Sequence, residues 1–330
     1  MPPKSFSAEL LKLDGAAEAG RIGAMLRDEV LRRFKKKGLI VALSGGVDSS
    51  VVAALAVRAV GPDRVLGLLL PERDSSPETL PLSQMVAGHL GIKAVREDIT
   101  GILEAAGCYR RQEEAIRLVI PEYGPGWKSK ILLPSVLADD QYRLYSVVAQ
   151  SPAGQRREAR LSLEAYLGLV AATNFKQRTR KMLEYYHADC LNYAVAGTPN
   201  RLEYDQGFFV KLGDGAADVK PIAHLYKTQV YQLARYLGLP AVICDRPPTT
   251  DTYSLPQSQE EFYFSLPYDK MDLVLYGNDH DYSAAEIGPA VGLTTEQVER
   301  VLRDIAGKRR MAGYLHAHPV LVGELRTQQS

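Results

Sequence analysis

The stretch Gly38-Leu-Ile-Val-Ala-Leu43, followed directly by Ser44-Gly-Gly-Val-Asp-Ser-Ser50, decides the fold. Its first half is a short apolar run, typical of a buried strand. Its second half holds a glycine pair, and residues 51–60 continue with helical spacing. Glycines let backbone amides approach a phosphate closely, and the N-terminus of the next helix favours negative charge. The stretch therefore predicts a strand, a phosphate-binding turn and a helix.

The rest of the first hundred residues repeats this alternation. An amphipathic helix is predicted over residues 16–37, two further strands over 64–70 and 93–98, and a helix between them at 82–90. Alternating strands and helices indicate right-handed crossovers, so we expect a doubly wound parallel sheet of about five strands flanked by helices. A ligand of such a sheet binds outside the carboxyl ends of the strands.

The remaining chain is less regular. In residues 101–160 the alternation of strands and helices is less regular. Stretches of alternating apolar and polar residues at 130–137 and 142–150 favour an inserted β-hairpin or lid. The elements expected beyond it are helices at 161–172 and 175–193, a stretch at 194–197 that ends in a turn, a strand–helix unit within 225–239, a strand at 241–244, a loop at 247–258 and helices near 269–276 and 295–305.

Composition narrows the class of protein. The chain has 330 residues, 46% of them hydrophobic, and a formal net charge of +1, so no excess of basic residues indicates a nucleic-acid or membrane partner. Its three cysteines match neither a disulfide framework nor a metal-ligand spacing. Because no segment offers about 18 consecutive apolar residues and the N-terminus does not resemble a signal peptide, we expect a cytoplasmic protein.

The glycine turn suits a pyrophosphate group. Ser44, Gly45, Gly46 and Ser49 would surround the phosphates, although the same four residues also fit a plain glycine-rich turn. Asp48 repels a phosphate unless a cation lies between them, so we interpret it as a magnesium ligand. The turn lacks the lysine of the Walker pattern, which argues against an ordinary kinase or switch GTPase.

At this turn the sequence resembles the N-type ATP pyrophosphatases, which have an adenine nucleotide alpha hydrolase-like fold. Within that superfamily, the second half of the chain resembles the ammonia-dependent NAD synthetases, and the similarity covers roughly residues 16–100 and 170–277. The motifs that carry it, in the order of the family, are Asn174-Phe-Lys-Gln-Arg-Thr-Arg180, Gly197-Thr-Pro-Asn-Arg-Leu-Glu203, Gly207-Phe-Phe-Val-Lys-Leu-Gly-Asp-Gly-Ala-Ala-Asp218, Pro221-Ile222, Leu225-Tyr-Lys-Thr-Gln229 and Pro248-Thr249.

The resemblance implies a carbon–nitrogen ligase that uses ATP and magnesium. Such an enzyme adenylates the carboxylate of deamido-NAD, and ammonia then displaces AMP to give NAD. It also implies one α/β domain over residues 1–330 without a glutaminase domain, so that free ammonia or a separate amidotransferase supplies the nitrogen. The family forms homodimers, with deamido-NAD bound near the subunit interface.

The resemblance assigns roles residue by residue. Catalysis falls to Asp48, Lys227 and Asp218, and magnesium binding to Asp48 and Glu203. The residues assigned to ATP are Ala42, Leu43, Ser44, Gly45, Gly46, Val47, Ser49, Thr198, Lys227 and Thr249, and those assigned to deamido-NAD are Arg178, Lys211 and Asp218.

Arguments from the residues themselves support some of these roles. Lys227 starts a helix, where a cation opposes the helix dipole and needs an anionic partner, which we expect to be an ATP phosphate. Glu203 is expected with Thr198 on one loop after a strand end. Taken alone, Glu203 or Arg178 also fits a solvated surface, Lys211 a surface ion pair, and Thr249 a simple turn.

Two features depart from the family pattern. The inserted region 101–160 is longer than in compact bacterial members and has no assigned role. The usual His-Lys pair near the C-terminus has no clear equivalent: the chain offers Lys308-Arg-Arg310, and His316 and His318. An adenylating ligase acting on another carboxylate is therefore the alternative, and a nucleotide-binding regulator without catalysis is a third hypothesis.

Overall fold

The centre of the protein is a parallel sheet of four strands. The computed structural model describes residues 6–137, 144–250 and 252–323. Within them the sheet has the order β3-β2-β1-β7, and all of its pairs are parallel. Its strands are β1 (Leu39–Ala42), β2 (Val65–Leu69), β3 (Lys93–Arg96) and β7 (Ala194–Ala196). The predicted parallel sheet is thereby confirmed, with four strands in the described residues instead of about five.

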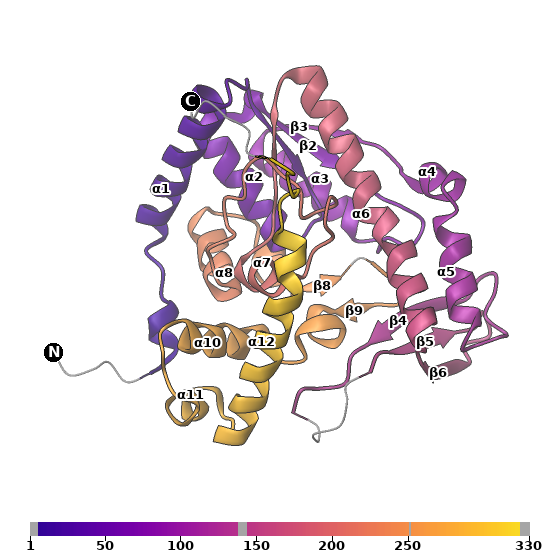
Figure 1. Cartoon of the computed structure of the whole chain (residues 1–330). Helices are drawn as coiled ribbons and strands as arrows, with labels where there is room; N and C mark the ends of the chain where they lie inside the picture. The colour runs from indigo at the N-terminus through magenta and orange to yellow at the C-terminus, as the bar shows by residue number, and fades with distance from the viewer. Residues whose placement is uncertain (1–5, 138–143, 251, 324–330) are drawn as a thin grey trace.

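Helices cover both faces of this sheet (Figure 1). Alternate residues of a strand point to opposite faces, so Leu39 and Val41 pack on one side and Ile40 on the other. The first face is covered by α1 (Gly15–Arg27), α2 (Val47–Val60), α3 (Thr79–Leu90) and α8 (Lys227–Tyr236). The second face is covered by α4 (Thr100–Ala105), α5 (Cys108–Arg117) and α6 (Leu163–Leu191).

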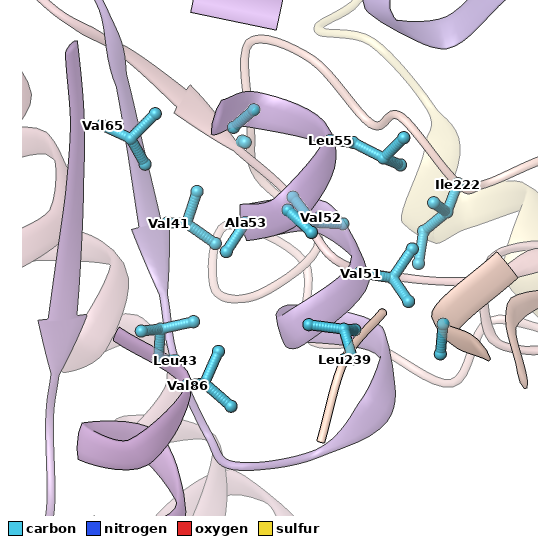
Figure 2. Packing of buried hydrophobic residues seen from close by; sticks show 14 of the residues in the cluster. Val41, Leu43, Val51, Val52, Ala53, Leu55, Val65, Val86, Ile222 and Leu239 are labelled. Carbon is cyan, nitrogen blue, oxygen red and sulfur yellow. The ribbon is translucent and has the colours of Figure 1, made fainter. Parts of the chain in front are cut away.

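The first face holds the largest buried core. Figure 2 shows Val51, Val52 and Leu55 of α2 among side chains from β1 and β2 and from later segments. Leu55 and Val41 are fully buried. Burying such side chains contributes about 1.5–3 kcal/mol each, which fixes α2, and with it the turn at its N-terminus, relative to the sheet.

Two predicted strands are absent from their expected positions within the described residues, and one strand of the sheet had no predicted bounds. The stretch 194–197, expected to end in a turn, contains strand β7, paired with β1 from Leu39↔Ala194 to Val41↔Ala196. The strand–helix unit expected within 225–239 is helix α8 alone. Residues 241–244 were expected as a strand, but they form the short helix α9 (Ala241–Cys244) after Pro240. A short apolar run is compatible with either state, and long-range pairing decides between them.

The region 101–160 is more structured than predicted. Besides α4 and α5 it contains a three-stranded antiparallel sheet, in which the expected hairpin has gained a third strand. Its strands are β4 (Lys128–Leu132), β5 (Ser146–Gln150) and β6 (Arg156–Arg160). Residues 142 and 143, at the start of the second predicted stretch, lie outside the described residues. The two helices expected at 161–172 and 175–193 are one continuous helix, α6.

Helices dominate the C-terminal part. Leu202, Val274 and Val301 belong to one buried cluster there, which α10, α11 and α12 share with α7. The elements not yet given are α7 (Arg201–Gln206), β8 (Thr249–Thr250), β9 (Gln257–Ser258), α10 (Tyr268–Asp279), α11 (Ala284–Val291) and α12 (Thr295–His316), with one-turn or wide helical segments at Ala8–Leu11, Asp28–Arg33, Pro62–Arg64 and Glu260–Phe264. No helix in the described ranges is long and apolar enough to cross a membrane.

Candidate functional site

The candidate site lies where the direction of winding reverses. Strands β1 and β7 are neighbours, but the chain leaves β1 toward β2 through α2, on the first face, and reaches β7 through α6, on the second. Such a reversal leaves a crevice at the carboxyl ends of the two strands. A cavity of about 1150 Å³ opens there, lined by Ser44, Asp48, Thr198, Glu203 and Lys227 among others.

The turn after β1 is held in shape by its own serines. The Ser49 hydroxyl donates to the Gly46 carbonyl at 3.2 Å and accepts from the Ser44 amide at 3.3 Å. Gly45 has φ +70°, and a Cβ on it would lie 2.7 Å from Cβ of Leu82. Only glycine fits this position, because L side chains disfavour positive φ and the packed helix α3 leaves no space. The turn thus presents the N-terminus of α2 to the cavity.

Asp48 and Lys227 form an ion pair at this end, in which Lys227 is buried and Asp48 is partly exposed. The Lys227 ammonium contacts one Asp48 carboxylate oxygen, and the Asn200 side-chain amide donates to the other at 3.0 Å. The Lys227 side chain is only 2% exposed. Burial alone would lower its pKa, but the charges of Asp48 and Glu203 outweigh burial and raise it. Lys227 therefore stays charged, and its partner in this structure is Asp48, whereas the sequence predicted a phosphate.

Glu203 lies on α7 and not on a loop as predicted. Its backbone amide donates to the Asn200 side-chain oxygen at 3.2 Å, and one of its carboxylate oxygens accepts from the Asn200 backbone amide at 3.1 Å. This capping box fixes the start of α7. The other oxygen accepts from the Gln259 side-chain amide at 2.9 Å. Burial, with the nearby Asp48 charge, raises the pKa of Glu203 to about 7.

The two carboxylates fit a divalent cation that is shared with phosphate. Asp48 and Glu203 both line the cavity, and the charge of Asp48 raises the pKa of Glu203, so a cation between them would relieve their repulsion. Magnesium is commonly held by one or two carboxylates together with substrate phosphates. Among the described residues no cluster of three or more acidic, histidine or cysteine side chains offers a complete site without substrate.

Asp272 of α10 anchors the helix that carries Lys227. Its carboxylate accepts from the backbone amides of Lys227 and Thr228 at 3.2 and 2.6 Å, at the N-terminus of α8. Burial raises the pKa of Asp272 to about 7. Sequence reasoning missed this residue, because the contact joins segments 44 residues or more apart and α8 has no capping signal for it in the adjacent sequence.

The other residues predicted for ATP gather at the same cavity with one exception. Ala42, Leu43, Gly46 and Val47 line it, as does Thr249 on β8. Gly45 is not among the lining residues and instead packs against α3. The structure therefore brings together nearly all of the predicted nucleotide residues.

The three residues predicted for deamido-NAD lie outside the lining of this cavity. Arg178 is exposed on α6, and its Nε donates to the Lys211 carbonyl at 3.3 Å. The Lys211 ammonium donates to the carbonyls of Tyr314 and Ala317 at 2.8 and 3.1 Å. The Asp218 carboxylate accepts from the Val195 amide at 2.7 Å, at the outer edge of β7. Asp218 also accepts from the Tyr185 hydroxyl of α6 at 3.4 Å, so both Lys211 and Asp218 contact the helix that carries Arg178.

The C-terminal histidines do not form a pair. His316 lies against the ring of Tyr204, and its Nε2 is 2.9 Å from the Tyr204 carbonyl oxygen. His318 is exposed. In the nearby basic run, Lys308 pairs with Asp304 at 2.7 Å, and Arg309 pairs with Asp205 and Asp279. The histidine pair therefore fits neither a metal site nor the cavity.

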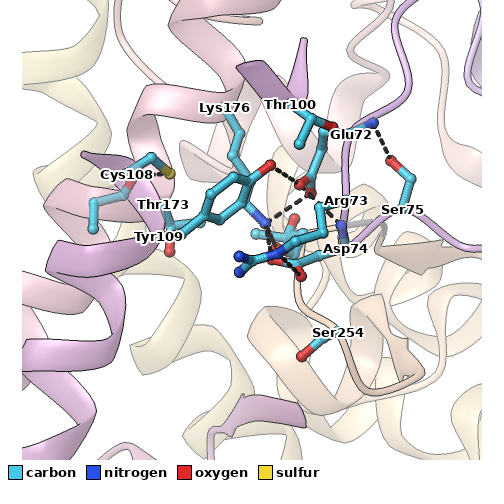
Figure 3. Close-up of polar contacts among 12 residues, drawn as sticks. Glu72, Arg73, Asp74, Ser75, Thr100, Cys108, Tyr109, Thr173, Lys176 and Ser254 are labelled. Carbon is cyan, nitrogen blue, oxygen red and sulfur yellow. Dashed lines mark hydrogen bonds and ion pairs between the residues drawn. The ribbon is translucent and has the colours of Figure 1, made fainter. Parts of the chain in front are cut away.

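A second buried polar cluster borders the same cavity, and the sequence did not reveal it (Figure 3). The Lys176 ammonium contacts Glu72 at 2.7 Å and Asp74 at 2.9 Å, and the Tyr109 hydroxyl donates to Glu72 at 2.8 Å. Lys176 and Glu72 have side chains 1% and 0% exposed. The signal available in the sequence was Lys176 itself, because it lies within the motif Asn174–Arg180, from which only Arg178 was assigned a role.

The winding of the sheet, the glycine turn after β1 and the carboxylate pair define an α/β protein of the N-type ATP pyrophosphatase class. The sequence profile described as NAD synthase matches residues 19–119 and 145–311. The chain belongs to the NAD synthase family.

Relatives of high identity carry the same description. The chain is 60% identical over 317 residues to an NH(3)-dependent NAD(+) synthetase of Rhizobium meliloti, covering 96% of this chain and 95% of that one. It is 58% identical to the protein of that name from Mesorhizobium japonicum, covering 96% and 99%. The protein of that name from Thermotoga maritima is 34% identical, covering 83% and 90%.

Solved structures agree in fold. A structure described as NMN synthetase from Francisella tularensis has a TM-score of 0.66 at 21% identity, covering 94% of this chain and 99% of that one. An NH3-dependent NAD synthetase from Campylobacter jejuni has a TM-score of 0.62 at 19% identity, covering 94% and 100%. At these identities the likeness concerns the fold alone.

Proposed function

We propose that the chain is an ammonia-dependent NAD synthetase, a ligase that makes NAD from deamido-NAD, ATP and ammonia. The observation that carries this proposal is that Asp48, Glu203 and Lys227 line one cavity beside the glycine turn. The chain is also 60% identical to an NH(3)-dependent NAD(+) synthetase. The family implies ATP as a substrate, and the cavity at the sheet reversal offers the groups that a triphosphate needs.

The first step is adenylation. A carboxylate oxygen of deamido-NAD attacks the α-phosphorus of ATP, and the bond from that phosphorus to the pyrophosphate oxygen breaks. Negative charge grows on the departing pyrophosphate, beside the N-terminus of α2 and the Lys227 ammonium. Fixed charges and amides of this kind stabilise a transition state without having to reorganise. For this step Lys227 exchanges part of its contact with Asp48 for the phosphates.

The second step is amidation. The ammonia nitrogen attacks the acyl carbon, a carbon–nitrogen bond forms, and the carbon–oxygen bond to AMP breaks. The attacking nitrogen must lose a proton. Asp218 is the predicted residue for holding ammonium or accepting that proton, and its exposed carboxylate is already engaged by the Val195 amide. Most of the acceleration comes from positioning of the two substrates.

Magnesium would be held by Asp48 and Glu203 together with ATP oxygens. When bound, it neutralises phosphate charge during the loss of pyrophosphate. Asn200 contributes to the same end of the cavity, because its side chain both donates to Asp48 and accepts from the Glu203 amide. It thereby keeps the two carboxylates at a fixed separation.

The arrangement of Arg178 supports a homodimer that completes the dinucleotide site. Residues four apart share one face of a helix, so Arg178 lies in line with Met182 and Tyr186, which are 54% and 59% exposed. Tyr314, over whose ring the Lys211 ammonium packs, is 72% exposed. Exposed apolar groups of this size around predicted substrate residues favour a covering second copy.

Two further parts of the proposal concern the setting of the enzyme. Cys108, Cys190 and Cys244 are unpaired, which suits the reducing cytoplasm. Free ammonium, or ammonia handed over by a separate amidotransferase, supplies the nitrogen. The alternative, a ligase acting on another carboxylate, would use the same nucleotide end.

One assay tests the proposal. Purified protein is given deamido-NAD, ATP, magnesium and ammonium, and NAD, AMP and pyrophosphate are measured. We expect NAD and AMP in equal amounts. AMP release with a different carboxylic acid, and none with deamido-NAD, would support the alternative, whereas ATP binding without pyrophosphate release would support the regulator.

A further inference from the structure

The segment of residues 252–261, which we name the rim strap, runs along the cavity and is held at its start by Lys176. The Lys176 ammonium donates to the Thr252 carbonyl at 3.0 Å. The same ammonium is fixed by Glu72 and Asp74, whose side chains are 0% and 11% exposed (Figure 3). A buried lysine with three acceptors has little freedom to move, so the first carbonyl of the strap has a fixed position.

The middle of the rim strap is held by strand β4. The Ser129 amide donates to the Ser254 hydroxyl at 2.9 Å, and the Ser129 carbonyl accepts from the Leu255 amide at 3.1 Å. Further along, the Lys130 ammonium donates to the Glu261 carboxylate at 2.9 Å. β4 is an edge strand, since it pairs with β5 on one side only. The strap occupies its other edge, which would otherwise expose unpaired backbone groups.

The far end of the rim strap reaches the nucleotide end of the cavity. The Gln259 side-chain amide donates to Glu203 at 2.9 Å, and the Gln259 backbone amide donates to the Pro248 carbonyl at 3.3 Å, beside Thr249. The second Glu203 oxygen accepts from the Asn200 amide. With both oxygens engaged, the Glu203 carboxylate has one orientation, and Gln259 supplies one of the two contacts that define it.

We propose that Gln259 is a positioning residue that orients Glu203 toward magnesium-bound ATP, and that β4 and Lys176 hold the strap in place for this purpose. The inference rests on the proposed function. It gives a role to β4, which lies within residues 120–144, the internal stretch that the family profile does not match. Strand β4 thereby supports the nucleotide end through the strap, without contributing a ligand of its own.

The decisive experiment is a double-mutant cycle on nucleotide binding. Affinity for ATP with magnesium is measured by calorimetry, without deamido-NAD, for the full chain, Gln259→Ala, Glu203→Gln and the double variant. A hydrogen bond to a charged group predicts about tenfold weaker binding for Gln259→Ala. Because Gln259 acts through Glu203, the same change in the Glu203→Gln background should cost less than about twofold.

A matched control and two outcomes complete the cycle. Gln297→Ala removes a glutamine that caps α12 away from the cavity, and it should leave the affinity unchanged. Equal weakening in both backgrounds, or no weakening by Gln259→Ala, would overturn the proposal. Wild-type protein that binds ATP with magnesium but makes no NAD would contradict the proposed function and leave the strap contact intact.

The support from β4 is tested by hydrogen–deuterium exchange. Ser254→Ala removes the acceptor of the Ser129 amide and should speed exchange across residues 252–261 and weaken ATP binding about threefold, in line with one lost neutral hydrogen bond. Ser151→Ala, which removes an acceptor in the β5–β6 turn of the same small sheet, is the control. Faster exchange without weaker binding would show that β4 does not act through the strap.

Discussion

The nucleotide end of the cavity and the surface that carries Arg178, Lys211 and Asp218 are built in opposite ways. At the nucleotide end, Lys227 is buried and paired with Asp48, and Glu203 has a partner on each carboxylate oxygen. On the other surface, Arg178 and Asp218 are exposed, and neither forms an ion pair with another residue that the structure describes. Arg178 donates to the Lys211 carbonyl, and Asp218 accepts from the Val195 amide and the Tyr185 hydroxyl.

The difference shows that the charged groups expected to bind ATP are already paired within one chain, whereas two of the residues predicted for deamido-NAD are exposed. Charged groups at the nucleotide end compensate one another, so the half-site exists before ATP arrives. Arg178 and Asp218 on the other surface are exposed, which fits our proposal that a second copy covers this half-site. Variants at the two ends should therefore fail in different ways.

Lys227→Met should have the largest effect. It removes the predicted phosphate contact and leaves the partly exposed Asp48 without its cation, so we expect kcat/KM for ATP to fall roughly 10³-fold and the free energy of unfolding to fall by about 2 kcal/mol. Lys308→Met, which breaks the ion pair with Asp304 on α12, a helix that does not line the cavity, is the control. It should lose comparable stability and keep its ATP affinity, and equal inactivation of both variants would contradict a specific role for Lys227.

Asp218→Asn tests the amidation step. If the carboxylate holds ammonium or accepts its proton, kcat/KM for ammonium should fall about 10²-fold, while pyrophosphate release in the absence of ammonium continues. The amide can still accept from the Val195 amide, so the edge of β7 should remain intact. Full amidation by this variant would show that Asp218 is structural only.

Titration of Asp272 should make the free energy of unfolding depend on pH. Its pKa is raised to about 7 in the folded chain from 3.8 when unfolded, so the folded state gains a proton. The resulting stability is present at low pH and is lost as pH rises through about 7. Wild-type stability relative to Asp272→Asn should fall by about 2 kcal/mol between pH 5.5 and 8.5, measured by urea unfolding. A constant difference across this range would contradict the raised pKa.

Arg178→Ala should have the smallest of these effects. We expect about a tenfold higher KM for deamido-NAD, from the loss of one charged contact, with the KM for ATP unchanged. Arg157→Ala, an exposed arginine on β6 paired with Glu122, should change neither constant. A rise in the ATP constant would show that the two ends are not independent.

Much of the fold was predictable because it depends on local patterns. Strands β1, β2 and β3 and helix α2 follow from apolar runs broken by glycine and polar turns. A strand end was expected before Thr198, but strand β7 was not given bounds, because Ala194–Ala196 is only three residues long and its pairing with β1 makes it a strand. Helix α6 was predicted as two helices with a break at residues 173 and 174, but it continues through both residues.

The candidate site was predicted to different depths. Asp48, Glu203 and Lys227 were named from the motifs, and the structure brings them together at one cavity. Their partners Asn200, Gln259 and Asp272 were not named. Gln259 and Asp272 contact their targets from segments far away in the chain. Asn200 is close to Glu203 in the sequence, but asparagine is common in loops and at helix starts, so its residue type alone does not indicate a role.

The sequence by itself determined the glycine turn, the order of the family motifs and the charged residues available for ATP, because these depend on residue type and short spacing. Only the tertiary structure decided that Lys227 pairs with Asp48, that residues 241–244 are helical, and that the rim strap joins β4 to Glu203. The physical reason is that these contacts link residues far apart in the chain, and their free energy exists only once the sheet has brought them together.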